Sequence, residues 1–327
     1  MAENEQIEPS ALQQDAVAPL LSILIVNFNG KHFLPECLLS LRKHVTVSHE
    51  IIMVDNASSD GSVEYVRQAH PEVKIVYNRT NLGFAAGNNQ GARVARGRYS
   101  LLLNNDTVVR SISPLIARME SDAHIGVLGC RLLYGDGCLQ ESIGYSPSVL
   151  SLVLSWTPLW HLFPSSKIFR RTVVGVSGLY QQEYTDVDWV SGACLLTRSA
   201  LWGHLGGLDE KYFMYMEEVD YCRRVRSVGL RVGYSCACQV THFEGAGRPW
   251  VGESALLSTA DSYMVYVSKF HGRVAVLVLR LLMVPVFMMR SLAFWAVYMV
   301  RIDSFGAEKG RAFFMASLKL IRGYARQ

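Results

Sequence analysis

The chain has 327 residues, half of them apolar, which suffices to bury a sizeable core and excludes a disordered protein. Its seven cysteines form no CxxC pair and no even framework, which disfavours a disulfide scaffold or a zinc protein. Residues 269–327 carry ten Lys and Arg against two acids, a local charge of +8, while the whole chain carries +4. This basic excess coincides with the most apolar region, which favours an anionic membrane surface over nucleic acid as a partner.

The first residues differ from the rest of the chain. Residues 1–18 carry four acids and no basic side chain, the opposite of a signal peptide's basic start. We therefore expect a disordered tail over 1–19. Regular structure is predicted to begin at 21–26, where the sequence LSILIV is an apolar run of strand length.

From residue 20 onward, short apolar runs alternate with helical stretches. The predicted strands are 21–26, 51–54, 73–77 and 99–103. Pro35 suits the first turn of the helix that follows the first strand. Strands that recur every ~25–30 residues with helices between them indicate successive βαβ units, and hence a mostly parallel sheet with helices on both faces.

Polar residues follow each of these strands, namely Asn27, Asp55, Asn78 and Asp106. Ligands of an open α/β sheet bind at the carboxyl ends of the strands, so these loops predict the site. Asn104 lies two residues before Asp106 on the same side of an extended chain. It can therefore present an amide oxygen beside the carboxylate, as a hard cation requires. The same residue types also suit an ordinary strand-ending turn.

The nucleotide-binding motifs with the most specific spacing are missing. No GxGxxG follows the first strand and no GxxxxGKS or GxxxxGKT occurs, which disfavours a dinucleotide or P-loop site. Asp55 is placed either to accept a hydrogen bond from a base imide or a ribose hydroxyl, or to cap a turn. The glycine-rich stretch 81–89 opens a helix and would bring backbone N–H groups near a phosphate.

The pattern from 108 to 187 is less regular, with one predicted strand at 125–129. The apolar stretch 150–163 contains two Trp and is either a packed surface element or a flap for an acceptor or a membrane. The run 187–197 indicates a strand interrupted by Ser191, Gly192 and Ala193, small residues that let a ligand or another backbone approach closely.

A helix is predicted over 216–228, with Glu217, Glu218 and Asp220 at its start. Acids at this position gain from the helix dipole, and they can also supply a general base. His242 follows a strand-like run that ends at Val240. It is either a structural histidine or a metal ligand.

Residues 274–300 are nearly all apolar, interrupted by Arg280, Pro285 and Arg290. The length suffices for one spanning helix, although a central arginine is costly in lipid. Two shorter interfacial helices separated at Pro285, or a pair of helices packed on a core, are the alternatives.

Taken together, six motifs resemble a known family. They are VNFNG at 26–30, VDNASSDGS at 54–62, NRTNLGFAAGNNQG at 78–91, LLNND at 102–106, GGLDEKYFMYMEEVDYCRR at 206–224 and THFEG at 241–245. In this order they resemble the inverting nucleotide-sugar glycosyltransferases of family 2, in their rhamnosyltransferase-like branch. The resemblance covers about residues 20–250. It implies an α/β GT-A fold there, Rossmann-like with a mostly parallel central sheet. The basic charge and the apolar run beyond it predict a helical, membrane-associating segment at 251–327.

The resemblance also implies roles for particular residues. Asp106 and His242 would hold Mg²⁺ or Mn²⁺, with Asn104 in place of the usual first acid of the metal motif. Glu218 would be the catalytic general base, with Glu217 as the fallback. The residues expected to bind the nucleotide-sugar are Asn27, Asp55, Asn78, Asn81, Gly83, Asn88, Asn104, Asn105, Gly192 and Ala193.

The implied reaction is a single displacement at the anomeric carbon. Glu218 takes a proton from an acceptor hydroxyl, which attacks opposite the leaving diphosphate. The expected donor is dTDP-rhamnose, with a galactofuranose, glucose or N-acetylhexosamine nucleotide as alternatives. The expected acceptor is a lipid-linked or cell-surface glycan, reached from the cytoplasmic face of the inner membrane by a peripheral or C-terminally anchored enzyme. A catalytically silent membrane partner in polysaccharide assembly is the alternative from another class.

Overall fold

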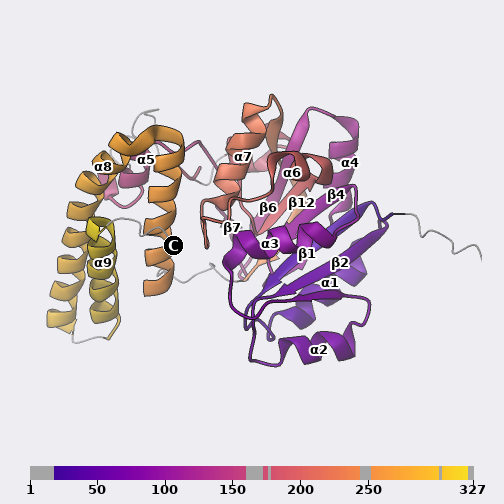
Figure 1. Ribbon diagram of the computed structural model, residues 1–327, viewed down its shortest axis with the longest axis horizontal. Helices are drawn as coiled ribbons and strands as arrows, with labels where there is room; N and C mark the ends of the chain where they lie inside the picture. The colour runs from indigo at the N-terminus through magenta and orange to yellow at the C-terminus, as the bar shows by residue number, and fades with distance from the viewer. Residues whose placement is uncertain (1–17, 160–171, 176–177, 244–251, 302–303, 323–327) are drawn as a thin grey trace, which may run out of the picture.

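Figure 1 shows the computed structural model of the protein, an α/β body beside a helical hairpin. The structure describes the chain except residues 1–17, 160–171, 176–177, 244–251, 302–303 and 323–327. The predicted disordered tail therefore lies, apart from its last two residues, outside the described part. The same holds for the last four residues of the apolar stretch 150–163.

The body is built on one mixed, mostly parallel sheet. Its strands lie in the order β3 (Lys74–Tyr77), β2 (His49–Asp55), β1 (Leu21–Asn27), β4 (Tyr99–Leu103), β11 (Cys194–Arg198), β6 (Ile125–Leu133), β12 (Arg231–His242) and β5 (Thr107–Val109). The first four strands are parallel, as predicted, and β12 is parallel to β6. Strand β11 enters antiparallel between β4 and β6, and β5 is antiparallel to β12.

Short strands complete this architecture at the rim. Strand β7 (Leu139–Gln140) pairs with β6, and β9 (Thr185–Asp186) pairs with β12. Strands β8 (Ile143–Gly144) and β10 (Trp189–Val190) form a separate two-stranded sheet. The predicted interruption of the 187–197 strand is confirmed, because residues 191–193 separate β10 from β11.

Helices cover both faces of the sheet. They are α1 (Leu34–His44), α2 (Ser62–Ala69), α3 (Gly83–Val94), α4 (Ser113–Ser121), α6 (Ser199–Leu205) and α7 (Glu217–Ser227). Helix α5 (Val149–Leu154) lies instead beside α8 (Glu253–Arg301), as Figure 1 shows, and a 3₁₀ turn spans Gly178–Gln181. Leu101 and Leu103 of β4 face the core shared with α1 and α4, whereas Leu102 faces the core shared with α3, α6 and α7. This alternation is the two-residue period of a strand buried on both sides.

The C-terminal helices contradict one expectation. Helix α8 (Glu253–Arg301) continues through Pro285, and its backbone departs from helical angles at Gly272, with φ 83° and ψ 174°. The prediction that Pro285 divides the apolar stretch into two short helices is therefore wrong. Proline has a helix-compatible φ and removes one hydrogen bond, whereas the left-handed φ of Gly272 cannot continue a helix.

The two halves of α8 have different surroundings. Its first half packs on the body, where Leu256, Met264 and Tyr266 are buried in the same core as α7. Its second half forms an antiparallel hairpin with α9 (Ser304–Arg322), as Figure 1 shows. The described part of the chain contains one helix, α8, that is long and apolar enough to cross a membrane.

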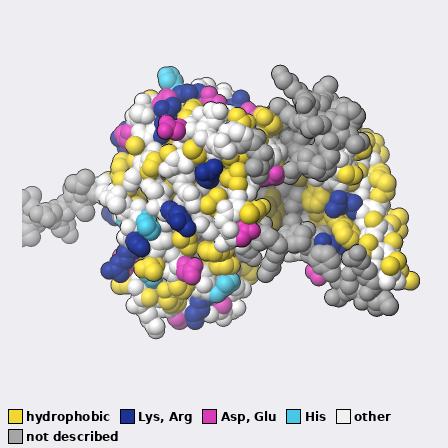
Figure 2. Space-filling model, turned by 180° about the vertical axis from the view of Figure 1, so that it is seen from behind, with side chains coloured by type: hydrophobic (Ala, Val, Ile, Leu, Met, Phe, Trp, Pro, Cys, Tyr) yellow, Lys and Arg dark blue, Asp and Glu magenta, His cyan; other side chains and the backbone are white. Residues whose placement is uncertain are grey.

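Large apolar side chains cover the outside of the hairpin. Leu279, Met283 and Phe287 are buried at every fourth position, which leaves the other faces of the second half of α8 uncovered. Val274 is 77% exposed and Val300 is 83% exposed. Seen from behind, hydrophobic side chains crowd this hairpin (Figure 2).

The two arginines of this apolar stretch are held by protein groups. Arg280 Nε donates to Leu320 O at the end of α9, at 2.5 Å. Arg290 donates to Trp156 O at 3.1 Å and lies 4.8 Å from the ring centre of Phe313. Carbonyl and aromatic partners of this kind lower the cost of a guanidinium in apolar surroundings.

Close packing of α3 on the sheet makes Gly87 a test of the fold. A Cβ on Gly87 would lie 2.9 Å from Val26 Cγ1, so Gly87→Ala should lower the free energy of unfolding by about 1–3 kcal/mol. Shortening the opposing side chain in the Gly87→Ala, Val26→Ala double variant should restore part of that loss. Urea unfolding midpoints measure both effects.

Gly203 of α6 is the matched control, because a Cβ added there would have no described heavy atom within 4 Å beyond its own helix turn. Gly203→Ala should therefore leave stability unchanged or slightly raised. A Gly87→Ala variant as stable as the wild type would contradict the close contact between α3 and β1.

Candidate active site

The polar residues at the strand ends come together as predicted. Asn27 and Asp55 are neighbours in the parallel pairing of β1 and β2. Asn27 Nδ2 donates to Asp55 Oδ1 at 3.0 Å, and Asn105 Nδ2 donates to Asn27 Oδ1 at 2.8 Å. The ends of three parallel strands are thereby joined in one hydrogen-bonded chain, because their side chains leave the sheet at the same edge.

Asp55 and Asn78 both hold neighbouring loops. Asp55 is 3% exposed, and its Oδ2 accepts from the Ser58 amide at 2.9 Å. Each of its oxygens keeps a second lone pair for a ligand donor. Asn78 Nδ2 donates to Asn56 Oδ1 at 2.8 Å and to Gln90 Oε1 at 2.6 Å.

The first backbone amides of α3 donate hydrogen bonds to oxygen atoms of the protein itself. Asn81 Oδ1 accepts from the Gly83 amide at 2.9 Å, and the Phe84 amide donates to Phe213 O at 2.8 Å. Gly83 has φ +84°, and a Cβ there would lie 2.2 Å from Phe213 O. Asn88 Nδ2 donates to Phe84 O, while its buried Oδ1 has no hydrogen-bond partner among the described residues. Asn88 thus offers an acceptor at this site, and the phosphate contact of the loop stays a prediction.

Strand pairing explains how His242 reaches Asp106. Antiparallel pairing places His242 opposite Thr107, the residue after Asp106. His242 Nε2 then lies 3.2 Å from Asp106 Oδ1 and 3.1 Å from Asn104 Nδ2. On its other side, Nδ1 lies 3.0 Å from Gln140 Oε1; the tautomer in which Nδ1 donates to this oxygen leaves a lone pair on Nε2.

This arrangement fits a divalent cation. A lone pair on Nε2 and a carboxylate oxygen of Asp106 face each other, which a cation between them would stabilise. A half-turn of the Asn104 amide replaces its nitrogen by an oxygen donor. Among the described residues no three His, Cys, Asp or Glu side chains form a metal group, so the diphosphate of a donor would have to contribute ligands.

Glu217 and Glu218 begin α7 directly after two residues with left-handed backbone. Tyr215 and Met216 each have φ 70°, which is uncommon for residues with a side chain and clusters at functional sites. Glu217 is 4% exposed and Glu218 is half-buried. The Oε2 atom of each is buried and has no hydrogen-bond partner among the described residues.

Burial makes both carboxylic acids weak. Desolvation raises the pKa of Glu218 to about 7, although the amides of Glu218 and Val219 offset part of the effect. Desolvation, followed by repulsion from Glu218, raises the pKa of Glu217 well above its usual value. A half-buried carboxyl with a pKa near neutrality has the properties of a general base.

The segment 191–193 lies between the two halves of the site. Ala193 O accepts from the Asn104 amide at 3.1 Å. A Cβ on Gly192 would lie 3.2 Å from the Phe84 ring and 3.7 Å from Glu218 Cβ. The missing side chain at Gly192 therefore lets the strand break lie close to Glu218, and it joins the Asp106 region to the start of α7.

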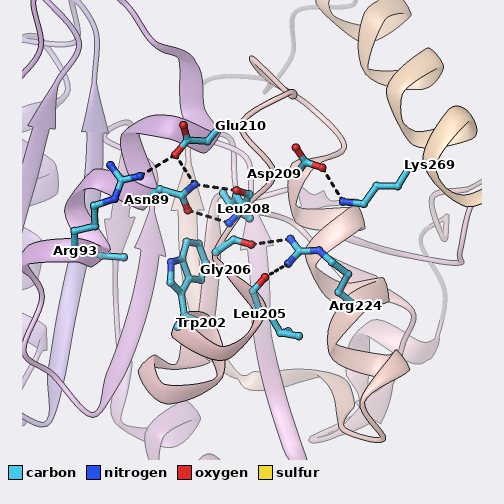
Figure 3. A pocket seen from close by; sticks show the side chains of 13 residues that line it. Asn89, Arg93, Trp202, Leu205, Gly206, Leu208, Asp209, Glu210, Arg224 and Lys269 are labelled. Carbon is cyan, nitrogen blue, oxygen red and sulfur yellow. Dashed lines mark hydrogen bonds and ion pairs between the residues drawn. The ribbon is translucent and has the colours of Figure 1, made fainter.

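Several contributing residues carry no signal in the sequence. Gln140, which lies beside His242, comes from a segment with no motif, and Phe84, which lies beside Gly192, falls within the 78–91 motif but has no predicted role there. The structure also has a cavity of about 640 Å³ between α3, the loop after α6, and α8 (Figure 3). No predicted site residue lines this cavity, so it is distinct from the site described above.

The chain is similar in sequence to known glycosyltransferases. The model of glycosyl transferase family 2 matches residues 22–177. A Mycobacterium tuberculosis protein named N-acetylglucosaminyl-diphospho-decaprenol L-rhamnosyltransferase is 26% identical over 268 residues, covering 77% of this chain and 85% of the relative. The Haloferax volcanii protein named low-salt glycan biosynthesis hexosyltransferase Agl10 is 28% identical, covering 67% of this chain and 65% of the relative.

Solved structures show the same fold. The mannosyltransferase PcManGT from Pyrobaculum calidifontis, solved with GDP-Man and Mn²⁺, has a TM-score of 0.56 at 13% identity and covers 93% of this chain and 87% of its own. GalNAc-T7, solved with UDP, GalNAc and Mn²⁺, has a TM-score of 0.52 at 16% identity; the match covers 78% of this chain but only 51% of GalNAc-T7. At these identities the likeness concerns the GT-A fold alone. Together with the matched family model and the named relatives, it supports a family 2 glycosyltransferase with rhamnosyltransferase-like relatives.

Proposed function

We propose that the chain transfers a sugar from a nucleoside-diphosphate donor to an acceptor hydroxyl with inversion at the anomeric carbon. The observation that carries the proposal is Glu218, a half-buried carboxyl whose pKa is raised to about 7. It adjoins Gly192, and the same strand break contacts the segment that holds Asp106. A base on one side and a diphosphate site on the other are what a single displacement needs.

The nucleotide part of the donor is assigned to the polar edge of the sheet. Asp55 offers the free lone pairs of a buried carboxylate to a base imide or a ribose hydroxyl. Asn27, Asn78, Asn105 and the residues that open α3 line the remainder of this edge. Asn88 Oδ1 supports the assignment, because it is buried and without a hydrogen-bond partner among the described residues.

Asp106 and His242, with Asn104 beside them, are assigned to a divalent cation, Mg²⁺ or Mn²⁺. When bound, the cation stabilises the charge that develops on the leaving diphosphate. Gln140 keeps the ring of His242 turned toward Asp106. Support comes from two proteins of the same fold that were solved with Mn²⁺.

Glu218 is assigned the proton transfer. Its Oε2 lies shielded from water and accepts the proton of the acceptor hydroxyl as that oxygen attacks the anomeric carbon. No second acid is required, because a diphosphate held by a cation leaves without a proton. Glu217, the fallback, is more deeply buried and keeps its proton to higher pH.

The donor is proposed to be dTDP-rhamnose, with galactofuranose, glucose and N-acetylhexosamine nucleotides as the alternatives. The name of the Mycobacterium tuberculosis relative supports rhamnose and a lipid-linked acceptor. The hexosyltransferase name of the Haloferax volcanii relative keeps the other hexoses open. A lipid-linked acceptor agrees with the exposed apolar hairpin, since both belong at a membrane.

The hairpin is proposed to hold the enzyme on the cytoplasmic face of the cell membrane. Its outer faces are apolar, and the basic residues of 269–327 favour anionic lipid headgroups. Arg290 is held against the hairpin by Trp156 and Phe313, so its charge does not oppose burial of the hairpin in apolar surroundings.

Loss of either assigned carboxylate should abolish turnover. Asp106→Ala removes a ligand for the cation and Glu218→Gln removes the base, so each should lower the release of nucleoside diphosphate by about a hundredfold or more. A panel of nucleotide-sugars with Mn²⁺ measures this. Glu72→Gln is the control, because Glu72 pairs with His70 at an exposed corner away from both assigned carboxylates. If both variants kept full turnover, the site assignment would be wrong.

The pH dependence separates Glu218 from Glu217. As a base, Glu218 must be ionised, so kcat/KM should rise through about pH 7 and be lost below it. Glu217→Gln should keep this rise at nearly the same pH, because Glu217 stays protonated while Glu218 titrates. Profiles of kcat/KM from pH 5 to 9 test this. If the Glu217→Gln enzyme lost the fall in kcat/KM below about pH 7, Glu217 rather than Glu218 would be the general base.

Exposed hairpin residues allow a test of membrane binding that spares the fold. Leu281, Leu292 and Met299 are each more than half exposed, so the triple change to Asp should weaken vesicle binding by about tenfold or more. Co-sedimentation with vesicles that contain anionic lipid measures the effect. Leu39→Asp is the control, since Leu39 is similarly exposed but lies on α1 of the body. Unchanged sedimentation of the triple variant would refute the docking surface.

A further inference from the structure

The first half of α8 contacts the segment that carries the two catalytic-site glutamates at several points. Ser262 Oγ donates to Met214 O at 2.9 Å, and Arg223 of α7 donates to Tyr266 Oη at 2.9 Å. Lys269 Nζ lies 2.7 Å from Asp209 Oδ2 and 2.7 Å from Asp220 Oδ2. Helix α8 therefore reaches both ends of the segment 209–220.

Asp220 is the most buried charge in this region. It has no exposure, and it lies two residues after Glu218 in the first turn of α7. Arg224 Nε lies 2.5 Å from its Oδ1, and Tyr212 Oη donates to its Oδ2 at 3.2 Å. A buried carboxylate requires such partners, and the loss of one costs far more than the loss of an exposed pair.

Arg224 and Lys269 do different things for this carboxylate. Arg224 also donates to Leu205 O at 2.8 Å and Gly207 O at 2.7 Å, which ties α7 to the loop after α6. Lys269 reaches across from α8, and Figure 3 shows it directed at Asp209 beside Arg224. Lys269 is thus the cation that joins Asp209 and Asp220 to a third element.

The segment between these two aspartates contains the left-handed residues Tyr215 and Met216. Backbone of this kind is strained and persists only where the surroundings fix it. Asp209 and Asp220 would repel each other without a shared cation. The Lys269 ammonium offsets that repulsion and links the two ends of the strained segment, from which Glu217 and Glu218 project.

We propose that Lys269 is a positioning residue for Glu218, so that the first half of α8 is part of the catalytic apparatus as well as the start of the C-terminal helices. The inference rests on the proposed function. Lys269 acts through Asp209, Asp220 and the backbone between them. The donor affinity should depend on it less than kcat does, because Lys269 itself contacts no residue assigned to the nucleotide or the cation; the segment 209–220 meets the nucleotide loop at the hydrogen bond from the Phe84 amide to Phe213 O.

The test compares Lys269→Met with the wild type in the full-length enzyme on its best donor. Met keeps most of the aliphatic stem and removes the charge. We expect kcat to fall about tenfold or more, with the donor KM within about twofold of the wild type. Lys269→Arg, which keeps the charge and can reach both carboxylates, should recover most of the rate. Asp209→Asn, a milder change that leaves Asp220 paired, should lower kcat severalfold and covers the case in which Lys269→Met does not fold.

Lys319→Met is the matched control. Lys319 also pairs with a carboxylate of α8, Asp261, and its side chain is 35% exposed against 32% for Lys269. It should keep the wild-type kcat. A folded Lys269→Met or Asp209→Asn enzyme with the wild-type kcat would overturn the positioning role while leaving the proposed function standing. A wild type that releases no nucleoside diphosphate from any donor would overturn the proposed function itself, and the positioning role with it.

Discussion

The buried carboxylate of Asp220 constrains the arrangement of the whole site. A charge without solvent must be paired, and its partners Arg224, Tyr212 and Lys269 come from three separate parts of the chain. Pairing them fixes α7 against the loop after α6 and against α8. Glu218 lies two residues away on the same helix turn, so its position follows from the geometry of this cluster.

A second constraint is the difference in surroundings between the carboxyl groups on the two sides of the site. Asp55 and Asp106 are almost fully buried; the Asn27 side chain and the Ser58 amide donate to Asp55, and the imidazole of His242 lies beside Asp106. Glu217 and Glu218 each have a buried oxygen with no such partner among the described residues, and burial raises the pKa of both. Carboxylates of one chain thus meet different surroundings, polar side chains at the strand ends and desolvation at the start of α7.

The C-terminal helices both complete the core of the α/β body and present exposed apolar faces. The first half of α8 has a buried face that completes the core over α7, and Gly272 then redirects the chain into a hairpin with apolar outer faces. Since the first half also pairs with Asp209 and Asp220, the element that begins the apolar hairpin is bonded to the segment that carries the glutamates. The apolar hairpin and the segment that carries Glu217 and Glu218 are therefore joined by one continuous element, α8.

The sequence by itself determined the order of strands and helices in the first hundred residues, because apolar runs, Pro35 and the polar strand ends are local signals. It also determined which residues meet at the sheet edge, since parallel strands must end at the same side. Only the tertiary structure decided the antiparallel entry of β11, the support of His242 by Gln140, the helix break at Gly272 rather than at Pro285, and the bridge from Lys269 to Asp209 and Asp220. Each of these depends on contacts between residues far apart in the chain or on a backbone angle, neither of which leaves a periodic pattern to read.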